Sequence, residues 1–215
     1  MNGHSRAQEE SQSQAWSHFY NGRLGWSAHA TNIVHHLPYL SVVLRGRPKS
    51  ILEVGSGSGS MSTFLSYVCK QVVSVDIERG IVDQCRRDMP RLMGSARYVL
   101  GDAFRLSEMG LPRFSVAVSQ GLMEHFDDDD IGRLIGEQLK VCGRVTFSVP
   151  NRAYARQDFG NERLLTTPEW RRLVRRLGFN VRLVADYRPF HWSKGLWRTM
   201  YRLDPIMTMC VIDPL

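Results

Sequence analysis

The chain has 215 residues and a formal net charge of +7, with 43% hydrophobic and 23% charged residues. This length suits one domain with a real core, and this composition excludes wholesale disorder and the membrane-spanning class. No apolar stretch reaches the roughly 18 residues of a membrane helix, and the start of the chain lacks the apolar stretch of a secretion signal. We therefore expect a soluble, cytoplasmic protein.

The positive charge comes mainly from arginine, with 24 Arg against 4 Lys. Guanidinium groups match phosphates and carboxylates, which favours nucleic acid or an anionic substrate as a partner. Genome base composition produces the same skew without any binding role. No Lys/Arg block in the sequence is long enough to decide between the two readings.

Taken in chain order, the first 14 residues are polar, and we expect a disordered leader over 1–14 followed by a single domain over 15–215. The stretch "SAHATNIVHHLPYLSVVL" has apolar residues at helical spacing with a break near Pro38, which predicts one or two helices. We interpret residues 15–46 as an N-terminal helical lid. The adjacent His35 and His36 point to different sides of such a helix and form no chelating pair.

Short apolar runs then alternate with amphipathic ones. Helices are predicted over 60–70, 79–89, 128–140 and 166–178, and strands over 50–55, 72–77, 96–101, 114–119, 143–149, 179–187 and 206–212. Strands that are apolar on both faces and followed by helices predict an α/β fold, in which a mostly parallel sheet is covered on both sides. The last strand follows a long connection, with 186–205 as an insertion, and is expected to run antiparallel.

Two groups of residues raise the question of a metal. The four cysteines, Cys69, Cys85, Cys142 and Cys210, are far apart and form no CxxC pair, so we expect reduced, packed thiols. The run "DDDD" (127–130) would suit magnesium or calcium, but it precedes a predicted helix. Acids at a helix start are stabilised by its unpaired N–H groups, so we predict no metal site.

The run "ILEVGSGSGS" (51–60) passes from a predicted strand into a predicted helix with the spacing Gly55-x-Gly57-x-Gly59. Backbone N–H groups are unpaired at such a junction, and glycine lets a ligand approach them without a Cβ in the way. The run therefore predicts a nucleotide cradle.

Which nucleotide it would hold is narrowed by three neighbouring features. Ser60 stands where a dinucleotide motif needs Gly or Ala, and no Lys follows Gly59 as a phosphate loop requires. Glu53, two positions before the first glycine, disfavours a phosphate and favours a cationic ligand.

In these features "ILEVGSGSG" resembles the first motif of the class I S-adenosylmethionine-dependent methyltransferases. "VVSVDIE", "VLGDAF", "SVAVSQGLMEHF" and "TFSVPN" resemble the motifs of the second to fifth strands in the small-molecule branch of that family. "TTPEWRRLVRRLGFNV" is similar to the branch's final helix and strand, so the resemblance spans about residues 50–185. "KVCG" replaces the family's usual Pro-Gly-Gly, a departure that concerns only the turn before the fifth strand.

The resemblance implies a Rossmann-like seven-stranded fold and S-adenosyl-L-methionine as cofactor. It implies that Asp76 accepts hydrogen bonds from the ribose hydroxyls, and that Asp102 meets the adenine amino group. The cofactor-binding residues carried over in this way are Glu53, Gly55, Ser56, Gly57, Gly59, Asp76, Ile77, Asp102, Ala103 and Ser119. Taken singly, Asp76 and Asp102 could each be helix caps, and it is their joint spacing that favours the cofactor.

His125, in "GLMEHF", lies past the fourth predicted strand, at the sheet edge where doubly wound folds bind ligands. Its titration range makes it the candidate general base for a methyl transfer. The alternative is that His125 only packs beside the cofactor or holds a loop. Its neighbour Glu124 is expected to be a solvated or capping acid.

Our first hypothesis is methyl transfer to an oxygen or nitrogen atom of a small molecule of aromatic or anionic character, in a biosynthetic role. The segments 16–26, 151–163 and 186–201 mix aromatics with arginines and are expected to set acceptor specificity. The alternatives are an RNA methyltransferase, motivated by the +7 charge, and a non-catalytic partner protein with the same fold. We expect no membrane partner and a monomer or homodimer.

Overall fold

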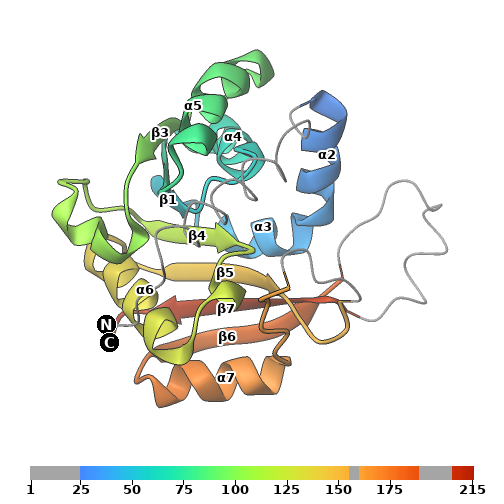
Figure 1. The fold of residues 1–215 in the computed structure, drawn as a ribbon, viewed down its shortest axis with the longest axis vertical. Helices are drawn as coiled ribbons and strands as arrows, with labels where there is room; N and C mark the ends of the chain where they lie inside the picture. Colours follow the sequence, from blue (N-terminus) through green and yellow to red (C-terminus); the bar gives the residue numbers. More distant parts are fainter. Residues whose placement is uncertain (1–24, 155–159, 189–204) are drawn as a thin grey trace.

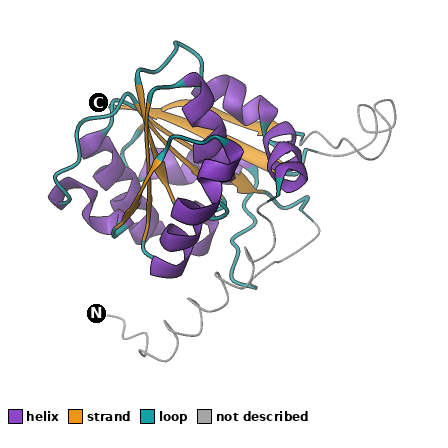
Figure 2. Ribbon diagram, turned by 90° about the horizontal axis from the view of Figure 1, so that it is seen from above, coloured by secondary structure: helices purple, strands orange, loops and turns teal. Residues whose placement is uncertain are grey.

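The computed structural model describes residues 25–154, 160–188 and 205–215, and in them one seven-stranded sheet lies between two layers of helices (Figures 1 and 2). The strands are β1 (Ser50–Val54), β2 (Gln71–Asp76), β3 (Arg97–Leu100), β4 (Val116–Gln120), β5 (Val145–Pro150), β6 (Asn180–Tyr187) and β7 (Met207–Asp213). The α-helices are α2 (Trp26–His35), α3 (Leu37–Val43), α4 (Ser60–Val68), α5 (Arg79–Asp88), α6 (Asp128–Val141) and α7 (Thr167–Arg176). Three short 3-10 helices, η1 (Met89–Leu92), η2 (Ala103–Glu108) and η3 (Met123–His125), lie in the connections.

The strand order is β3-β2-β1-β4-β5-β7-β6. Strands β1 to β5 are parallel, and β7 pairs antiparallel with both β5 and β6. In Figure 1, β4 and β5 point toward the side where α2 and α3 lie, and β7 points the opposite way. The predicted Rossmann-like, mostly parallel fold with an antiparallel last strand is confirmed. The carboxyl ends of β1, β2, β4 and β5 therefore share one edge, where such folds bind ligands.

The two helical layers follow from the alternation of side chains along the strands. Leu52 and Val54 of β1 pack in the cluster that contains α6 and α7, whereas Ile51 packs with α2, α3 and α4 on the other face. Trp170 of α7 is fully buried and packs edge-on against Phe147 of β5. This two-sided burial is why the strands are apolar along their whole length.

The helix starts predicted from the sequence are formed as expected. Thr166 and Glu169 make a capping box at the start of α7. At α6, the side chain of Asp127 accepts a hydrogen bond of 2.9 Å from the backbone N–H of Asp130. The aspartate run 127–130 is thus a helix cap and first turn.

The connection between β3 and β4 is the parallel crossover for which no helix bounds were predicted from the sequence. That connection contains only the 3-10 helix η2, not the full helix that the other parallel crossovers have. The segment that follows has Gly110 at φ +63° and then Pro112, and both residues oppose helix continuation.

In the described part of the chain the four cysteines are buried and unpaired, as expected. Within those residues, no helix is both long and apolar enough to cross a membrane. The leader 1–14 and most of the insertion 186–205 lie outside the described residues.

Candidate active site

The glycine loop connects β1 to α4 through a tight turn. Gly55, Gly57 and Gly59 have φ angles of +83°, +49° and +71°, a region that L side chains rarely adopt. At Gly59, a Cβ would lie 2.8 Å from the Sγ atom of Cys85 and 2.9 Å from the Cγ atom of Met89. Position 59 therefore requires glycine for both conformation and space.

Asp76, at the carboxyl end of β2, ties this loop to the start of α5. Its Oδ2 atom accepts hydrogen bonds from the backbone N–H groups of Ser56 (2.7 Å) and Gly57 (3.4 Å), and its Oδ1 atom accepts one from Glu78 (2.9 Å). Burial raises the pKa of Asp76, and these hydrogen bonds oppose the rise. Asp76 is thus a backbone cap at the same edge of the sheet where the ligand is predicted.

Glu53, on β1, is the first acid at this edge and is only 3% exposed. Its Oε2 atom accepts a hydrogen bond of 2.6 Å from the Ser74 hydroxyl, which lies 2.7 Å from the Ser56 hydroxyl. Burial raises the pKa of Glu53 to about 7, against the lowering effect of the serine hydrogen bonds. A carboxyl that titrates near neutrality therefore lies under the glycine loop.

Glu124, in η3, is a second buried acid and is 2% exposed. The prediction that it is a solvated or capping residue is wrong. The backbone N–H of Arg163 donates a 2.8 Å hydrogen bond to the Glu124 carbonyl, so residues 160–165 cover this turn. Burial raises the pKa of Glu124 to about 8, and in the described part of the chain its Oε2 atom has no hydrogen-bond partner.

The next residue, His125, lies between Glu124 and residues 160–165. Its Nδ1 atom is 2.8 Å from the Oδ1 atom of Asn161, and its Nε2 atom is 4.0 Å from the Oε1 atom of Glu124. Burial lowers the pKa of His125, while Asn161 and Glu162 act in the opposite direction. The ring is therefore neutral near pH 7, and a Nδ1–H that donates to Asn161 leaves the Nε2 lone pair as an acceptor.

Glu53, Glu124 and His125 line one cavity of about 490 Å³ at the carboxyl edge of the sheet, whereas Asp76 lies outside its wall. Of the predicted site residues, those that line it are Glu53, Gly55, Ser56, Gly57 and His125. The wall also includes Tyr154 and Glu162 from the segment 151–163 that was expected to set acceptor specificity, and Asn32 and His35 from the predicted lid. Gln120 of β4 and Glu124 also line it, and neither was predicted as a site residue. The cavity is bordered by α2 on one side and by the segments after β4 and β5 on the other.

The remaining predicted residues lie outside the wall of this cavity. Asp102 caps η2 by accepting a 2.8 Å hydrogen bond from the Phe104 N–H, and Ala103 follows it. Next to Asp76, the Ile77 side chain is 65% exposed. Gly59 lies behind the loop, and Ser119 is buried within β4. The cofactor roles of these residues stay predictions.

Helices α2 and α3 are fixed to the sheet by buried histidines. The Nδ1 atom of His29 lies 2.8 Å from the Ser60 hydroxyl at the start of α4. The Nδ1 atom of His36 lies 2.8 Å from the hydroxyl of Tyr187, which is 2.5 Å from the Ser148 hydroxyl. Helix α2 is thus held against the glycine loop, and its movement as a lid stays a prediction.

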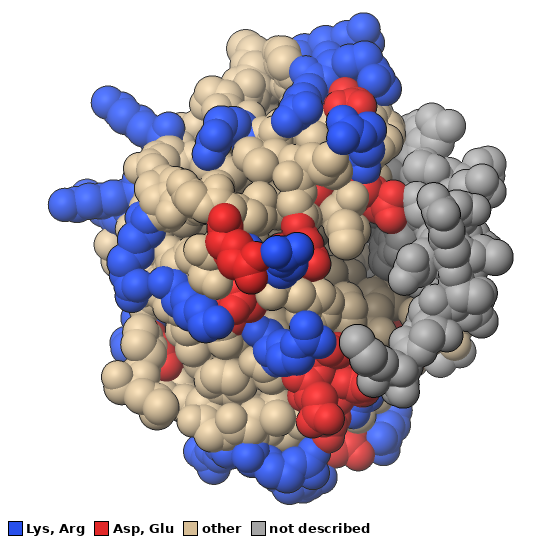
Figure 3. All heavy atoms as spheres, turned by 60° about the vertical axis from the view of Figure 1, so that its left-hand side comes forward, with Lys and Arg blue, Asp and Glu red and all other residues tan. Residues whose placement is uncertain are grey.

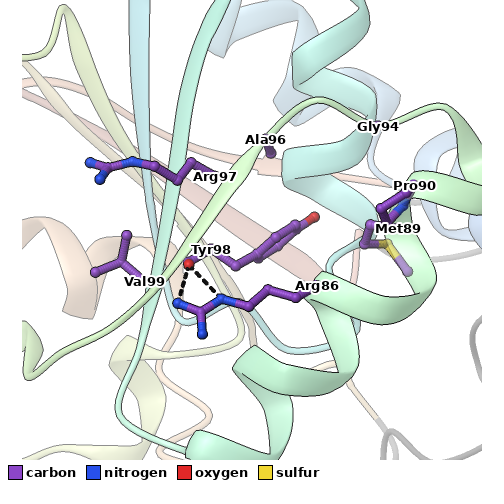
Figure 4. Close-up of a pocket in the computed structure, with 8 residues that line it drawn as sticks. All are labelled: Arg86, Met89, Pro90, Gly94, Ala96, Arg97, Tyr98 and Val99. Atoms are coloured by element: carbon purple, nitrogen blue, oxygen red, sulfur yellow. Dashed lines mark hydrogen bonds between the residues drawn. The ribbon is translucent and has the colours of Figure 1, made fainter.

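A second cavity, of about 440 Å³, lies at the edge strand β3 beside α5 and η1 (Figure 4). There the Arg86 guanidinium donates two hydrogen bonds, of 3.0 and 2.8 Å, to the Tyr98 carbonyl. Its wall contains no acid and none of the predicted site residues. Across the described residues, no cluster of three or more His, Cys, Asp or Glu side chains is placed to hold a metal ion. The cavity at the carboxyl edge is therefore the candidate active site.

Comparisons with known proteins agree with this geometry. Residues 51–144 match the family described as "Methyltransferase domain". A protein-L-isoaspartate O-methyltransferase from Nitrobacter winogradskyi is 30% identical over 118 residues, which are 51% of this chain and 54% of the relative. The chain thus spans about half the length of the curated relative that it matches.

Solved structures share the fold at low identity. The N-methyltransferase NodS from Bradyrhizobium japonicum, in complex with S-adenosyl-L-homocysteine, has a TM-score of 0.65 at 12% identity, over 94% of this chain and 98% of that chain. A magnesium protoporphyrin IX methyltransferase from Synechocystis has a TM-score of 0.63 at 12% identity, over 95% of each chain. Residues 51–144 thus match a methyltransferase domain, in agreement with the resemblance of this chain to the class I S-adenosylmethionine-dependent methyltransferases.

Proposed function

We propose that this protein transfers a methyl group from S-adenosylmethionine to an oxygen or nitrogen atom of a small-molecule acceptor. The observation that carries the proposal is the cavity at the carboxyl edge, where a glycine loop and buried acids meet. A cationic sulfonium ligand suits buried carboxylates better than a phosphate does. The S-adenosyl-L-homocysteine in the NodS structure supports the same choice of cofactor.

The residues at this edge fit the proposed cofactor in three respects. The loop at Gly55 and Gly57 has no side chain between its backbone and the cavity. Ile77 offers an exposed apolar surface for an adenine ring, and Asp76 beside it offers oxygen acceptors for ribose hydroxyls. When bound, the cofactor would supply an electrophilic methyl group on a positively charged sulfur.

The protein's own contribution is chiefly to position the acceptor. Holding two reactants in line can lower a barrier by about 7 to 11 kcal/mol. The cavity provides a site for this between α2 and the segment that carries Glu162. For a hydroxyl acceptor, we assign His125 as the base, because its neutral ring leaves Nε2 able to take a proton.

The alternative of an RNA substrate rests on the +7 charge. On the face shown in Figure 3, Lys and Arg side chains are interleaved with acidic ones and do not form one continuous basic patch. Several are paired with neighbours on their own helix, as in Arg133–Asp130 and Lys140–Glu137. Phosphate contacts make binding steeply salt-dependent, so an RNA-binding titration at two salt concentrations separates the two hypotheses.

The proposal is tested by incubating the protein with methyl-labelled S-adenosylmethionine and a cell extract that contains both metabolites and RNA. We expect label in the low-molecular-mass fraction, and less of it with the Asp76→Ala variant when S-adenosylmethionine is limiting. Label that is found only in RNA would replace the small-molecule proposal with the RNA alternative. No labelled product and no cofactor binding would favour the non-catalytic partner.

A further inference from the structure

The cavity is acidic although the protein is basic. Three carboxylate side chains, Glu53, Glu124 and Glu162, line it. The chain has 28 Lys and Arg residues, yet none of them is among the described residues of the cavity wall. His36 and His125, also in the wall, have lowered pKa values because they are buried, so they are neutral near pH 7. The described wall thus offers three acids and no Lys or Arg. Burial raises the pKa of Glu53 to about 7 and that of Glu124 to about 8, and a bound cation would favour their charged forms.

Two of the acids are already hydrogen-bonded within the protein. Glu53 accepts a hydrogen bond from Ser74, and Glu162 accepts one of 2.9 Å from the backbone N–H of Gly160. Glu124 is also buried, with 2% of its surface exposed, but its Oε2 atom has no hydrogen-bond partner among the described residues. A buried polar atom without a partner is rare in native proteins and calls for a specific explanation.

We propose that the methyl acceptor is an amine, and that the Glu124 carboxylate binds its ammonium group in the cavity. This inference rests on the proposed function and narrows its acceptor from oxygen or nitrogen to nitrogen. An ammonium group supplies both the hydrogen-bond donors and the positive charge that the Glu124 oxygen lacks. It also differs from the anionic acceptor that the arginine-rich segments of the sequence suggested.

Glu124 then has a chemical role as well as a binding role. The ammonium gives one proton to a Glu124 oxygen, and the nitrogen lone pair attacks the methyl carbon as the carbon–sulfur bond breaks. The electrons of that bond stay on sulfur, so the products are a methylated ammonium and the neutral thioether. The proton on Glu124 leaves to solvent when the product departs.

The titration of Glu124 supports this role. Burial raises the pKa of its carboxyl to about 8, which brings it closer to the range of an amine. Proton transfer is most efficient when donor and acceptor have similar affinities for the proton near the working pH. An ordinary exposed carboxyl, with a pKa near 4.5, would be a much weaker base.

The test measures the binding of matched probes to the protein saturated with S-adenosylhomocysteine. The probes are benzylamine with benzyl alcohol and butylamine with butanol, so that each pair differs in the group that Glu124 would recognise. Ligand-observed NMR titrations give each dissociation constant. We expect each amine to bind more tightly than its alcohol, and Glu124→Gln to weaken amine binding by about 10- to 100-fold, as the loss of a charged hydrogen bond does.

The control variant is Asp129→Asn, which removes the same charge from an exposed position on α6, and it should leave both probes unaffected. S-adenosylhomocysteine must bind Glu124→Gln as it binds the unaltered protein, which also shows that the variant is folded. Weaker binding of S-adenosylhomocysteine to Glu124→Gln would assign Glu124 to the cofactor and overturn the inference. Amines that bind no better than their alcohols would overturn it as well.

The same titration separates this inference from the proposed function. If the unaltered protein does not bind S-adenosylhomocysteine, the proposed function itself fails. If it binds S-adenosylhomocysteine and prefers alcohols to amines, the proposed methyl transfer stands and only the assignment of an amine acceptor fails. Labelled product with the methyl group on oxygen would lead to the same correction.

Discussion

The two sides of the cavity use buried acids in different ways. On the glycine-loop side, Glu53 and Asp76 are hydrogen-bonded by serine and by backbone N–H groups, and they hold the loop in place. On the side formed by η3, Glu124 is equally buried but has an oxygen without a partner in the described part of the chain. The acids on the glycine-loop side are satisfied by the protein itself, whereas the unsatisfied oxygen of Glu124 is where, in our proposal, the acceptor binds.

The largest expected effect is a loss of stability on the glycine-loop side, at Gly59. In Gly59→Ala the new Cβ meets Cys85 and Met89 at under 3 Å, in a backbone conformation that alanine rarely adopts. We expect a loss of about 2 to 4 kcal/mol in the free energy of unfolding, from left-handed strain and overpacking together. Urea denaturation measures it. Gly136→Ala, in α6 with open space around its Cβ position, is the control, and it should not destabilise the protein.

The next effect concerns Asp76 and the cofactor. Asp76→Ala removes a carboxylate that accepts three backbone hydrogen bonds and, in our proposal, those of the ribose hydroxyls. The binding free energy of S-adenosylhomocysteine should weaken by about 1.5 to 3 kcal/mol. Calorimetry measures this change, and Asp83→Ala on the outer part of α5 is the matched control. An unchanged dissociation constant would remove Asp76 from the site.

On the side formed by η3, a substitution is expected to stabilise the protein, in contrast to Gly59→Ala. The pKa of Glu124 is raised in the folded protein from 4.5 to about 8, so the folded state binds the extra proton in that window. The stability of the unliganded protein must then fall as the pH rises from about 4.5 through 8. Glu124→Gln has no titrating carboxyl at this position, so at pH 9 it should be more stable than the unaltered protein by about 1 to 2 kcal/mol. This is less than the full effect of the pKa shift, because water that enters the cavity reduces it.

Urea titrations of both proteins at pH 5 and pH 9 measure this difference. The two proteins should differ little at pH 5, where the Glu124 carboxyl is protonated. Glu53 titrates in the same window in both proteins, so it cancels in the comparison. Equal stabilities at pH 9 would contradict the burial of an unpartnered carboxylate at position 124.

The smallest expected effect concerns His125. Its hydrogen bond to Asn161 raises the pKa of the imidazole against the lowering effect of burial. In Asn161→Ala that pKa should fall further, by the equivalent of about 0.5 to 1.5 kcal/mol. An NMR titration of the His125 ring protons measures it. Asn180→Ala, at an exposed position, is the control and should leave the titration of His125 where it is.

The contrast between the glycine-loop side and the side formed by η3 also explains which parts of the site could be predicted from the sequence. The glycine loop and Asp76 are recognisable because local constraints, such as positive φ at Gly59 and a strand end at residue 76, require particular residue types. The strands were predictable as short apolar runs, and most helices from the helical spacing of their apolar residues. The connection after β3, where no helix was predicted, contains Gly110 and Pro112, and both oppose a full helix.

Glu124 was not predictable in the same way. Its burial depends on residues 160–165, which cover η3 through the hydrogen bond from Arg163 to the Glu124 carbonyl. A contact between positions so far apart leaves no periodic signal in the sequence. Asn32 and Glu162 also reach the cavity from distant segments, but the segments themselves, the lid 15–46 and 151–163, were predicted to lie near the site.

The most direct test of the central claim is calorimetric titration of the protein with S-adenosylhomocysteine. The account predicts saturable binding of one molecule per chain, weakened by Asp76→Ala and retained in Glu124→Gln. Absence of binding by the folded protein, or tight binding of a pyrophosphate dinucleotide in its place, would contradict it.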